Sequence, residues 1–207
     1  NRRARTTLAR YLIIYFLAHM SEIPEGLPPH AQRAFKGEIW EIWQWEQVQF
    51  DGSIKTYERA IRTDSVTAIP LVGDRILIQH QEQPFRGSFI SLPGGFREAD
   101  DPLDDAKREL LEESGYASER WVHYLSWSPP ASKLIWKNHF YIAHDCKKIQ
   151  EMIPDPGEKI TLVFIDFDTF LLMADNPTWR HRDLVPTLLR ARYEPDKRRA
   201  LEEALFG

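Results

Sequence analysis

The stretch Leu92-Pro93-Gly94-Gly95-Phe96-Arg97-Glu98-Ala99-Asp100-Asp101-Pro102, continued by residues 103–116, decides the fold of this chain. It predicts a glycine-rich loop followed by a helix. Asp101 is a favourable N-cap, and Pro102 is a favourable first helical residue because that position needs no amide hydrogen bond. Gly115 predicts the end of the helix, since glycine readily adopts the left-handed conformation found there. These three residues predict where the helix begins and ends.

Three glutamates share one face of the predicted helix. Glu109, Glu112 and Glu113 are spaced i, i+3 and i+4, so their side chains are neighbours. Their carboxylates repel one another unless solvent or a cation neutralises them. Oxygen ligands of this kind suit Mg²⁺ or Mn²⁺. A solvated acidic helix face is the alternative, but Arg108 and Gly115 at fixed offsets from the glycine loop favour the cation site.

The same stretch resembles the Nudix box, G-x5-E-x7-R-E-U-x-E-E-x-G-U, in which U is a bulky apolar residue. Gly94, Asp100 and residues 108–116 match its spacing, with Tyr116 as the last U. Asp100 stands where the family has Glu, and the Leu-Pro-Gly-Gly start indicates a loop one residue shorter than usual. The resemblance implies an α/β/α sandwich with a mixed sheet.

The resemblance also implies roles for the residues of the box. The carbonyl of Gly94 would hold the metals together with Glu109 and Glu113, and Glu112 would share a second metal. Arg108 lies one turn from Glu112, at i+4, where it can orient that carboxylate by a charge-assisted hydrogen bond. An ordinary surface ion pair is the alternative for Arg108.

Residues from about 35 to 170 are similar to the ADP-ribose pyrophosphatase branch of this superfamily. Residues 57–62 resemble the strand that precedes the core in that branch. Gln81-Glu82-Gln83-Pro84-Phe85-Arg86 resembles its E-Q-x-R motif with one extra residue, and residues 158–160 resemble its late acidic loop. These matches are short and less specific than the box.

Three residues are expected to contact the substrate. Arg86 is the best candidate for a phosphate contact, because a planar guanidinium binds phosphate through two hydrogen bonds. Glu58 is a weaker candidate for a contact with the base. Gly95, like Gly94, lets the backbone approach metal or phosphates because no Cβ intervenes. Trp127 and Phe85 could stack on an adenine, although aromatic residues at such positions more often belong to a core.

Two residues are candidates for the general base that takes a proton from the attacking water. Glu112 is close to the expected metal site. Glu158 lies on a Pro-Gly loop that could close over the site, and the resemblance to the ADP-ribose branch points to it. An exposed loop glutamate is the alternative interpretation of Glu158, so both candidates stay open.

The composition limits the class of protein. The 207 residues are 43% hydrophobic and 12% aromatic, enough for one packed domain with terminal extensions. A net charge of −4, from 27 basic and 31 acidic residues, argues against long RNA or DNA as the partner. Cys146 is the only cysteine, which excludes a disulfide framework and favours a reducing cytoplasm. No apolar run approaches the ~20 residues needed to span a membrane.

Residues 1–34 are predicted to be an N-terminal extension. Residues 1–10 are basic and residues 11–18 are apolar. Three interpretations stay open: a signal peptide, a helix that lies on the domain or on a partner, and a segment joined at His19-Met20 ahead of the native sequence. Residues 1–19 would thus be a targeting segment, a docking helix or an added segment.

Residues 35–62 predict an aromatic β-hairpin. Its strands run from Glu38 to Phe50 and from Ile54 to Ile61, around a turn at Asp51-Gly52. An edge hairpin packed on the main core is one interpretation. A dimerisation surface is the other, because so aromatic a hairpin needs burial on more than one side.

Residues 63–175 are predicted to form the hydrolase domain, and residues 176–207 its closing helices. Further strands are expected at 66–72, 75–79, 89–92, 121–127, 138–144 and 160–164, and further helices at 168–173, 184–191 and 197–205. Strands mixed with one central helix and terminal helices indicate an α+β protein. The histidines show no metal-ligand spacing, and His181 and Arg182 are expected at the surface.

The resemblance implies a Mg²⁺-dependent enzyme, with Mn²⁺ as an alternative, that hydrolyses a nucleoside diphosphate linked to another moiety. ADP-ribose, giving AMP and ribose 5-phosphate, is the first candidate. The alternatives are another nucleotide-sugar, a dinucleotide or an oxidised nucleotide, and a non-catalytic nucleotide-binding module supported only by Asp100 and the short loop. The expected partners are a small-molecule substrate and a second copy of the chain, with no nucleic acid polymer and no membrane.

Overall fold

The structure is a computed structural model that describes residues 23–84, 86–130 and 133–207. The expectations for residues 1–22 and Phe85 therefore lie outside the described residues. The described chain forms two compact units. Unit 1 comprises residues 23–62 and 133–135, and unit 2 comprises residues 63–84, 86–130 and 136–207. Among the helices of these residues, none is long and apolar enough to cross a membrane.

Unit 1 is a small sheet built around the predicted hairpin. Its strands, in the order β1-β2-β3-β9, are β1 Gln32–Lys36, β2 Trp40–Val48, β3 Ile54–Arg62 and β9 Leu134–Ile135. β2 pairs with β3 in register from Trp40↔Arg62 to Val48↔Ile54, which confirms the two hairpin strands. Neither β1 nor β9 was predicted. Trp43 is 2% exposed and forms the buried centre of this sheet.

Unit 2 contains a six-stranded mixed sheet in the order β12-β5-β4-β10-β8, with β6 paired to β5. Its strands are β4 Ser65–Val72, β5 Arg75–Gln83, β6 Gly87–Ser91, β8 Arg120–Trp127, β10 Asn138–His144 and β12 Lys159–Ile165. β4 and β10 are parallel, and the other pairs are antiparallel. A separate two-stranded pair joins β7 Tyr116–Ala117 to β11 Lys147–Lys148.

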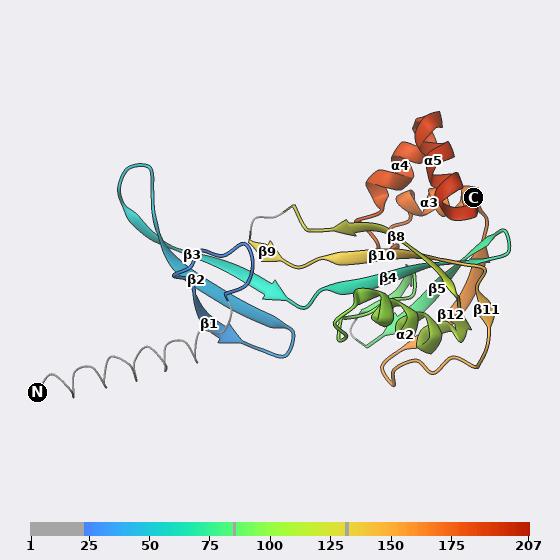
Figure 1. Ribbon diagram of the computed structural model, residues 1–207, viewed down its shortest axis with the longest axis horizontal. Coiled ribbons are helices and arrows are strands. Elements are labelled where there is room, and N and C mark those ends of the chain that lie inside the picture. Colours follow the sequence, from blue (N-terminus) through green and yellow to red (C-terminus); the bar gives the residue numbers. More distant parts are fainter. Residues whose placement is uncertain (1–22, 85, 131–132) are drawn as a thin grey trace, which may run out of the picture. The chain divides into compact units, whose positions relative to one another are not determined.

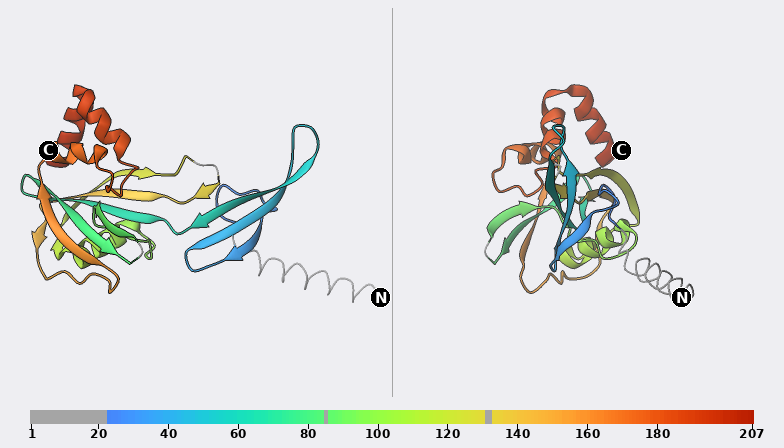
Figure 2. Two further views of the ribbon diagram at one scale, coloured as in Figure 1. Left: turned by 180° about the vertical axis from the view of Figure 1, so that it is seen from behind. Right: turned by 90° about the vertical axis from the view of Figure 1, so that its left-hand side faces the viewer.

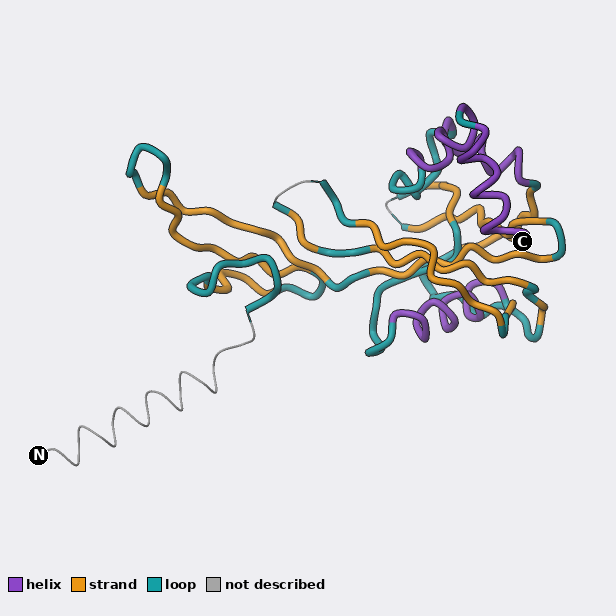
Figure 3. Tube along the Cα trace, turned by 45° about the horizontal axis from the view of Figure 1, so that its top comes forward, coloured by secondary structure: helices purple, strands orange, loops and turns teal. Residues whose placement is uncertain are grey.

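Helices cover both faces of the unit 2 sheet, as Figure 1 and, from behind, Figure 2 show. The helices are α2 Pro102–Ser114, α3 Phe167–Leu172, α4 Val185–Tyr193 and α5 Pro195–Phe206, with a 3₁₀ turn at Met173–Asp175. α2 packs on β4 and β10 from one side, while α3 packs on β5 and α5 on β10 from the other. Figure 3 shows the helices in purple on either side of the strands. This α/β/α sandwich confirms the expected fold class.

The side chains of β4 alternate between the two faces of the sheet and so contribute to the apolar cores on both faces. Val66 and Ala68 point toward α2, where Ala106 and Leu110 complete two small clusters. The odd-numbered residues, including Ile69, point toward α3, α4 and α5 in the main core. Successive residues of a strand face opposite sides, so one strand serves both layers. The sheet therefore holds α2, and everything that α2 carries, in a fixed place.

Candidate active site

Local capping interactions fix α2, the helix that carries the glutamates. The Asp101 side chain accepts a hydrogen bond from the Leu103 amide at 2.9 Å, and Pro102 is the first helical residue. Gly115 ends the helix with φ 76° and donates its amide to the Leu111 carbonyl at 2.8 Å. Both ends lie where the sequence predicts them. The register of the carboxylates along the helix is thereby set.

The three glutamates of α2 differ in burial. Glu113 is 4% exposed, whereas the side chains of Glu109 and Glu112 are 14% and 46% exposed. Loss of hydration, with repulsion from Glu109 and Glu158, raises the pKa of Glu113 to about 8. Loss of hydration is also the main cause that raises the pKa of Glu109 to about 7. Burial therefore disfavours the charged forms of Glu109 and Glu113 as long as no cation neutralises them.

These carboxylates fit a divalent cation. Their hard oxygen atoms are the ligands that Mg²⁺ prefers, and a cation would offset the loss of hydration and the smaller repulsion that raise the pKa values of Glu109 and Glu113. A Cβ added at Gly95 would lie 2.3 Å from Glu109 Oε1, so the glycine leaves the space that the carboxylate fills. In the described part of the chain, no three His, Cys, Asp or Glu side chains already converge as ligands. The carboxylates of Glu112 and Glu113 accept hydrogen bonds from Arg108 and from the Gly94 amide.

Arg108 contacts two of the glutamates. Its Nη1 donates to Glu112 Oε2 at 2.9 Å, and its Nη2 lies 2.9 Å from Glu109 Oε1. The contact with Glu112 is the i, i+4 pair that the spacing predicts. Because one guanidinium holds both carboxylates, it restricts the orientation of each.

Asp105 is a part of the site that the sequence did not indicate. It is 1% exposed, and its Oδ2 accepts hydrogen bonds from the amides of Glu98 and Ala99 at 2.9 and 2.8 Å. Its Oδ1 accepts from Arg108 Nη2 at 3.1 Å. Burial alone would raise the pKa of Asp105, but the two amides and Arg108 outweigh it and keep the pKa below its ordinary value. Asp105 therefore ties the glycine loop to Arg108.

Asp100 occupies the position of the glutamate in the Nudix box, but it is not the residue whose carboxylate anchors the loop. Its backbone carbonyl accepts a hydrogen bond from Arg97 Nη2 at 2.7 Å. The anchoring carboxylate is Asp105, one turn before Arg108 at i−3. An acidic residue at that offset was the only signal in the sequence that could have identified it.

The glycine loop is fastened to β4. Gly94 donates its amide to Glu113 Oε2 at 2.9 Å, and a Cβ at Gly94 would lie 2.2 Å from the Val66 carbonyl oxygen. The Val66 amide in turn donates to the Gly95 carbonyl at 3.0 Å. With any residue other than glycine at position 94, the loop could not lie this close to β4.

A chain of glutamines connects the buried glutamate to the late loop. Gln79, Gln81 and Gln83 occupy alternate positions of β5 and so lie on one face. Gln79 donates to Glu113 at 3.1 Å, Gln81 to Gln79 at 2.6 Å, and Gln83 to Gln81 at 3.4 Å and to Glu158 Oε1 at 2.7 Å. Glu158, more than forty positions from α2 in the sequence, is thereby held within the same network.

The remaining predicted site residues contact residues other than the glutamates of α2. Arg86 lies over the Phe89 ring, with its Cζ atom 4.5 Å from the ring centroid. Glu58 belongs to unit 1, where it accepts a hydrogen bond from Gln44 at 3.2 Å. Trp127 packs beside Trp136 at the edge of the main core, so its contacts are those of a core residue.

The prediction that His181 lies at the surface is wrong. His181 is 7% exposed, and its Nε2 accepts a hydrogen bond from the Leu92 amide at 3.0 Å. Burial disfavours the charged imidazole and, with the charge of Arg180, lowers its pKa to about 3. The ring is therefore neutral and acts as an acceptor just before the glycine loop. Arg182 is exposed, as expected.

Comparisons with known proteins agree with this arrangement. The family model of the NUDIX domain matches residues 61–188, more than half of the chain. The methanol dehydrogenase activator of Bacillus methanolicus is 23% identical over 160 residues, which cover 73% of this chain and 84% of that protein. An ADP compounds hydrolase shares the fold, with a TM-score of 0.66, 18% identity, and coverage of 79% of this chain and 90% of that one. Because the match spans the glycine loop, α2 and most of unit 2, the chain belongs to the Nudix hydrolase family.

Proposed function

We propose that this protein is a Mg²⁺-dependent hydrolase that cleaves the diphosphate of a nucleoside diphosphate linked to another moiety. The observation that carries the proposal is the cluster of Glu109, Glu112 and Glu113 behind a glycine loop, with Arg108 across it. Mn²⁺ is a plausible substitute because it accepts the same oxygen ligands.

Glu109, Glu112 and Glu113, with the carbonyl of Gly94, would hold the cation. When bound, a divalent cation neutralises charge on the diphosphate oxygens and makes phosphorus more open to attack. Arg108 would keep Glu109 and Glu112 oriented. The missing Cβ at Gly94 lets the loop lie directly against β4, which would fix the position of its carbonyl.

Glu112 and Glu158 are the candidates for the general base. The side chain of Glu112 is 46% exposed and is paired with Arg108. Glu158 is hydrogen-bonded to Gln83, and its charge acts on Glu109 and Glu113. We favour Glu158, because Glu112 is one of the proposed metal ligands and its carboxylate already accepts a hydrogen bond from Arg108.

ADP-ribose is the first substrate to test. The ADP compounds hydrolase with the similar fold acts, by its name, on compounds of this chemical class. Hydrolysis would add one water and release AMP and ribose 5-phosphate. Arg86 would bind phosphate, Gly95 would let the loop backbone approach it, and Glu58 would contact the base. The expected setting is the reducing cytoplasm.

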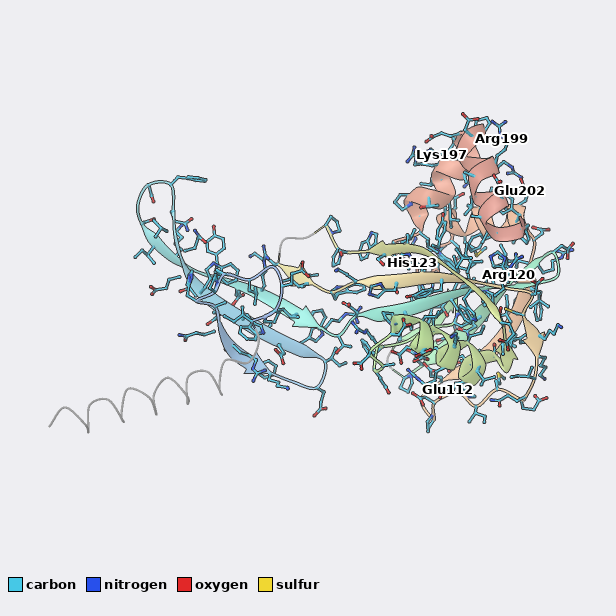
Figure 4. All side chains as sticks on the ribbon, in the orientation of Figure 1. Glu112, Arg120, His123, Lys197, Arg199 and Glu202 are labelled. Carbon is cyan, nitrogen blue, oxygen red and sulfur yellow. The ribbon has the colours of Figure 1, made fainter. Side chains whose placement is uncertain are left out.

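The test is AMP release from ADP-ribose with and without Mg²⁺, beside a panel of nucleotide-sugars, dinucleotides and oxidised nucleotides. Glu113→Gln replaces the buried carboxylate by an amide. Glu202→Gln makes the same replacement on α5 and is the control, since Figure 4 places Glu202 on the other side of the sheet from Glu112. We expect metal removal and Glu113→Gln to abolish turnover, and Glu202→Gln to preserve it.

Each outcome decides a different part of the proposal. A faster reaction with another panel member would keep the chemistry and replace ADP-ribose as the substrate. No turnover of any member with Mg²⁺ or Mn²⁺ would contradict the enzyme and favour a nucleotide-binding module. Undiminished turnover by Glu113→Gln would contradict the assignment of α2 as the metal-binding helix.

A further inference from the structure

Residues 178–180 lie beside β6 and place Arg180 near the Phe89 ring. The Ile90 amide donates to the Thr178 carbonyl at 3.0 Å, and the Arg180 amide donates to the Ile90 carbonyl at 2.8 Å. Ile90 and Trp179 form a parallel bridge. In an extended segment, successive side chains point to opposite sides. Trp179 and Arg180 therefore face different layers of the sandwich.

Trp179 and His181 anchor this segment in the main core. Trp179 is 1% exposed and packs edge-on against Phe170 and His181. His181 is buried as well and accepts a hydrogen bond from the Leu92 amide. With both neighbours fixed on the core side, the side chain of Arg180 is directed to the opposite side.

Arg180 and Arg86 meet at one aromatic ring. The Cζ atom of Arg180 lies 5.6 Å from the Phe89 ring centroid, and that of Arg86 lies 4.5 Å from it. Phe89 pairs in register with Gln81, so it lies on the same face as the glutamine chain that leads to Glu113. Two guanidinium groups thus stand on the active-site face of the sheet.

The surroundings of Arg180 suit an anion. Loss of hydration and the charge of Arg86 lower its pKa, while Glu113 and Glu158 act in the opposite direction. Arg180 nevertheless keeps an exposed surface. Within the described residues, no carboxylate lies at ion-pair distance from Arg180 or Arg86. Two unpaired cations that repel each other would be stabilised by a group with several negative oxygens between them.

We propose that Arg180 and Arg86 form a clamp for the phosphate groups of the diphosphate substrate, with the Phe89 ring in contact with both guanidinium groups. The clamp rests on the proposed function and adds a binding residue from the C-terminal segment. Each planar guanidinium can offer two parallel N–H donors to a phosphate. The carboxylates of α2 and the clamp would then bind different oxygens of one diphosphate.

The test measures binding separately from turnover. Calorimetry with α,β-methylene-ADP in Mg²⁺ gives a Kd for a diphosphate that resists hydrolysis, and steady-state kinetics give KM and kcat for the best substrate of the panel. The variants are Arg180→Gln, Arg180→Lys and the control Arg199→Gln, which makes the same change of charge on the exposed face of α5 (Figure 4).

We expect Arg180→Gln to raise Kd and KM about tenfold or more, as the loss of a charge-assisted hydrogen bond predicts. The value of kcat should change less. Arg180→Lys should give an intermediate loss, because it keeps the charge without the paired donors. Arg199→Gln should bind as the native protein does.

The clamp is overturned if Arg180→Gln binds the analogue as tightly as the native protein, or if Arg199→Gln weakens binding equally. It is also overturned if the native protein does not bind the analogue. If nothing in the panel is cleaved but Arg180→Gln still weakens binding, the proposed function fails and the clamp stands.

Discussion

Asp105 performs two tasks at the scale of a single residue. Its carboxylate accepts hydrogen bonds from two loop amides and from the Arg108 guanidinium. The adjacent acidic residue, Asp104, is exposed. A buried carboxylate with three donors is well satisfied. Its removal leaves the two loop amides without their acceptor and Arg108 with only its two glutamate partners.

Asp105→Ala should therefore destabilise the fold by about 1–3 kcal/mol and lower kcat, because buried donors lose their acceptor. Asp104→Asn should change the free energy of unfolding by less than about 0.5 kcal/mol, as surface substitutions usually do. Urea unfolding and AMP release measure both effects. A large loss in Asp100→Ala with none in Asp105→Ala would place the anchoring role at Asp100 instead.

His181 predicts a pH dependence of stability. Its folded pKa of about 3 lies below the model-peptide value of 6.5, so the unfolded chain binds more protons between these pH values. The free energy of unfolding should therefore fall as pH drops below 6.5, at up to about 1.4 kcal/mol per pH unit from this group. His181→Gln should flatten the fall, and His80→Gln at an exposed position should not. Equal slopes in urea unfolding for all three proteins would contradict the prediction.

At the scale of the element, Gly115 ends α2 in a crowded place. Its φ is 76°, and a Cβ there would lie 2.2 Å from the Gln150 carbonyl oxygen. Gly73, in the turn from β4 to β5, has φ 61° but no atom within 4 Å of such a Cβ. The two glycines share the left-handed conformation and differ in the space around them.

Gly73→Ala should cost about 1–2 kcal/mol for the left-handed backbone alone. Gly115→Ala should cost clearly more, because the same conformational term is joined by a clash with backbone. Chemical unfolding of the two variants measures the difference. Equal losses would show that the contact with Gln150 relaxes without cost.

The glutamine chain couples two elements, β5 and the loop that carries Glu158. Gln83→Leu removes the donor to Glu158 and should lower kcat if that carboxylate is the base. A double-mutant cycle with Glu158→Gln checks the coupling. Gln83→Leu should have no further effect in the Glu158→Gln background. Additive losses would mean that Gln83 acts on the site independently of Glu158.

At the scale of the whole molecule, unit 1 exposes large apolar side chains. Val48 and Ile54 pair across the end of the hairpin and are 63% and 61% exposed. Tyr57 and Phe35 are 44% and 56% exposed in the same unit. Apolar surface of this kind is typical of a protein interface, so we propose a homodimer.

Light scattering should give twice the 24.3 kDa mass of one chain. Val48→Asp with Ile54→Asp should give a monomer that keeps its β-sheet signal by circular dichroism. Val122→Asp, at an exposed valine of unit 2, is the control and should stay dimeric. A native mass near 24.3 kDa would contradict the homodimer.

The sequence by itself determined the helix, its caps and the face that carries the glutamates. Asp101, Pro102, Gly115 and the i, i+4 contact of Arg108 depend on residues within a few positions of one another, and local geometry suffices for them. Most strands were also predicted, because alternating apolar residues report which faces are buried.

Only the tertiary structure decided which distant residues join that helix. Gln79 and Glu158 join one hydrogen-bonded network with Glu113 because β12 pairs with β5, and Arg180 reaches Phe89 because residues 178–180 lie along β6. The family resemblance pointed to Glu158, but no local pattern records either pairing. The burial of His181 has the same origin, since a short polar segment becomes interior only when the sheet and helices enclose it. Local interactions therefore determine the helix and its carboxylates, and the pairing of distant strands determines which other residues lie beside them.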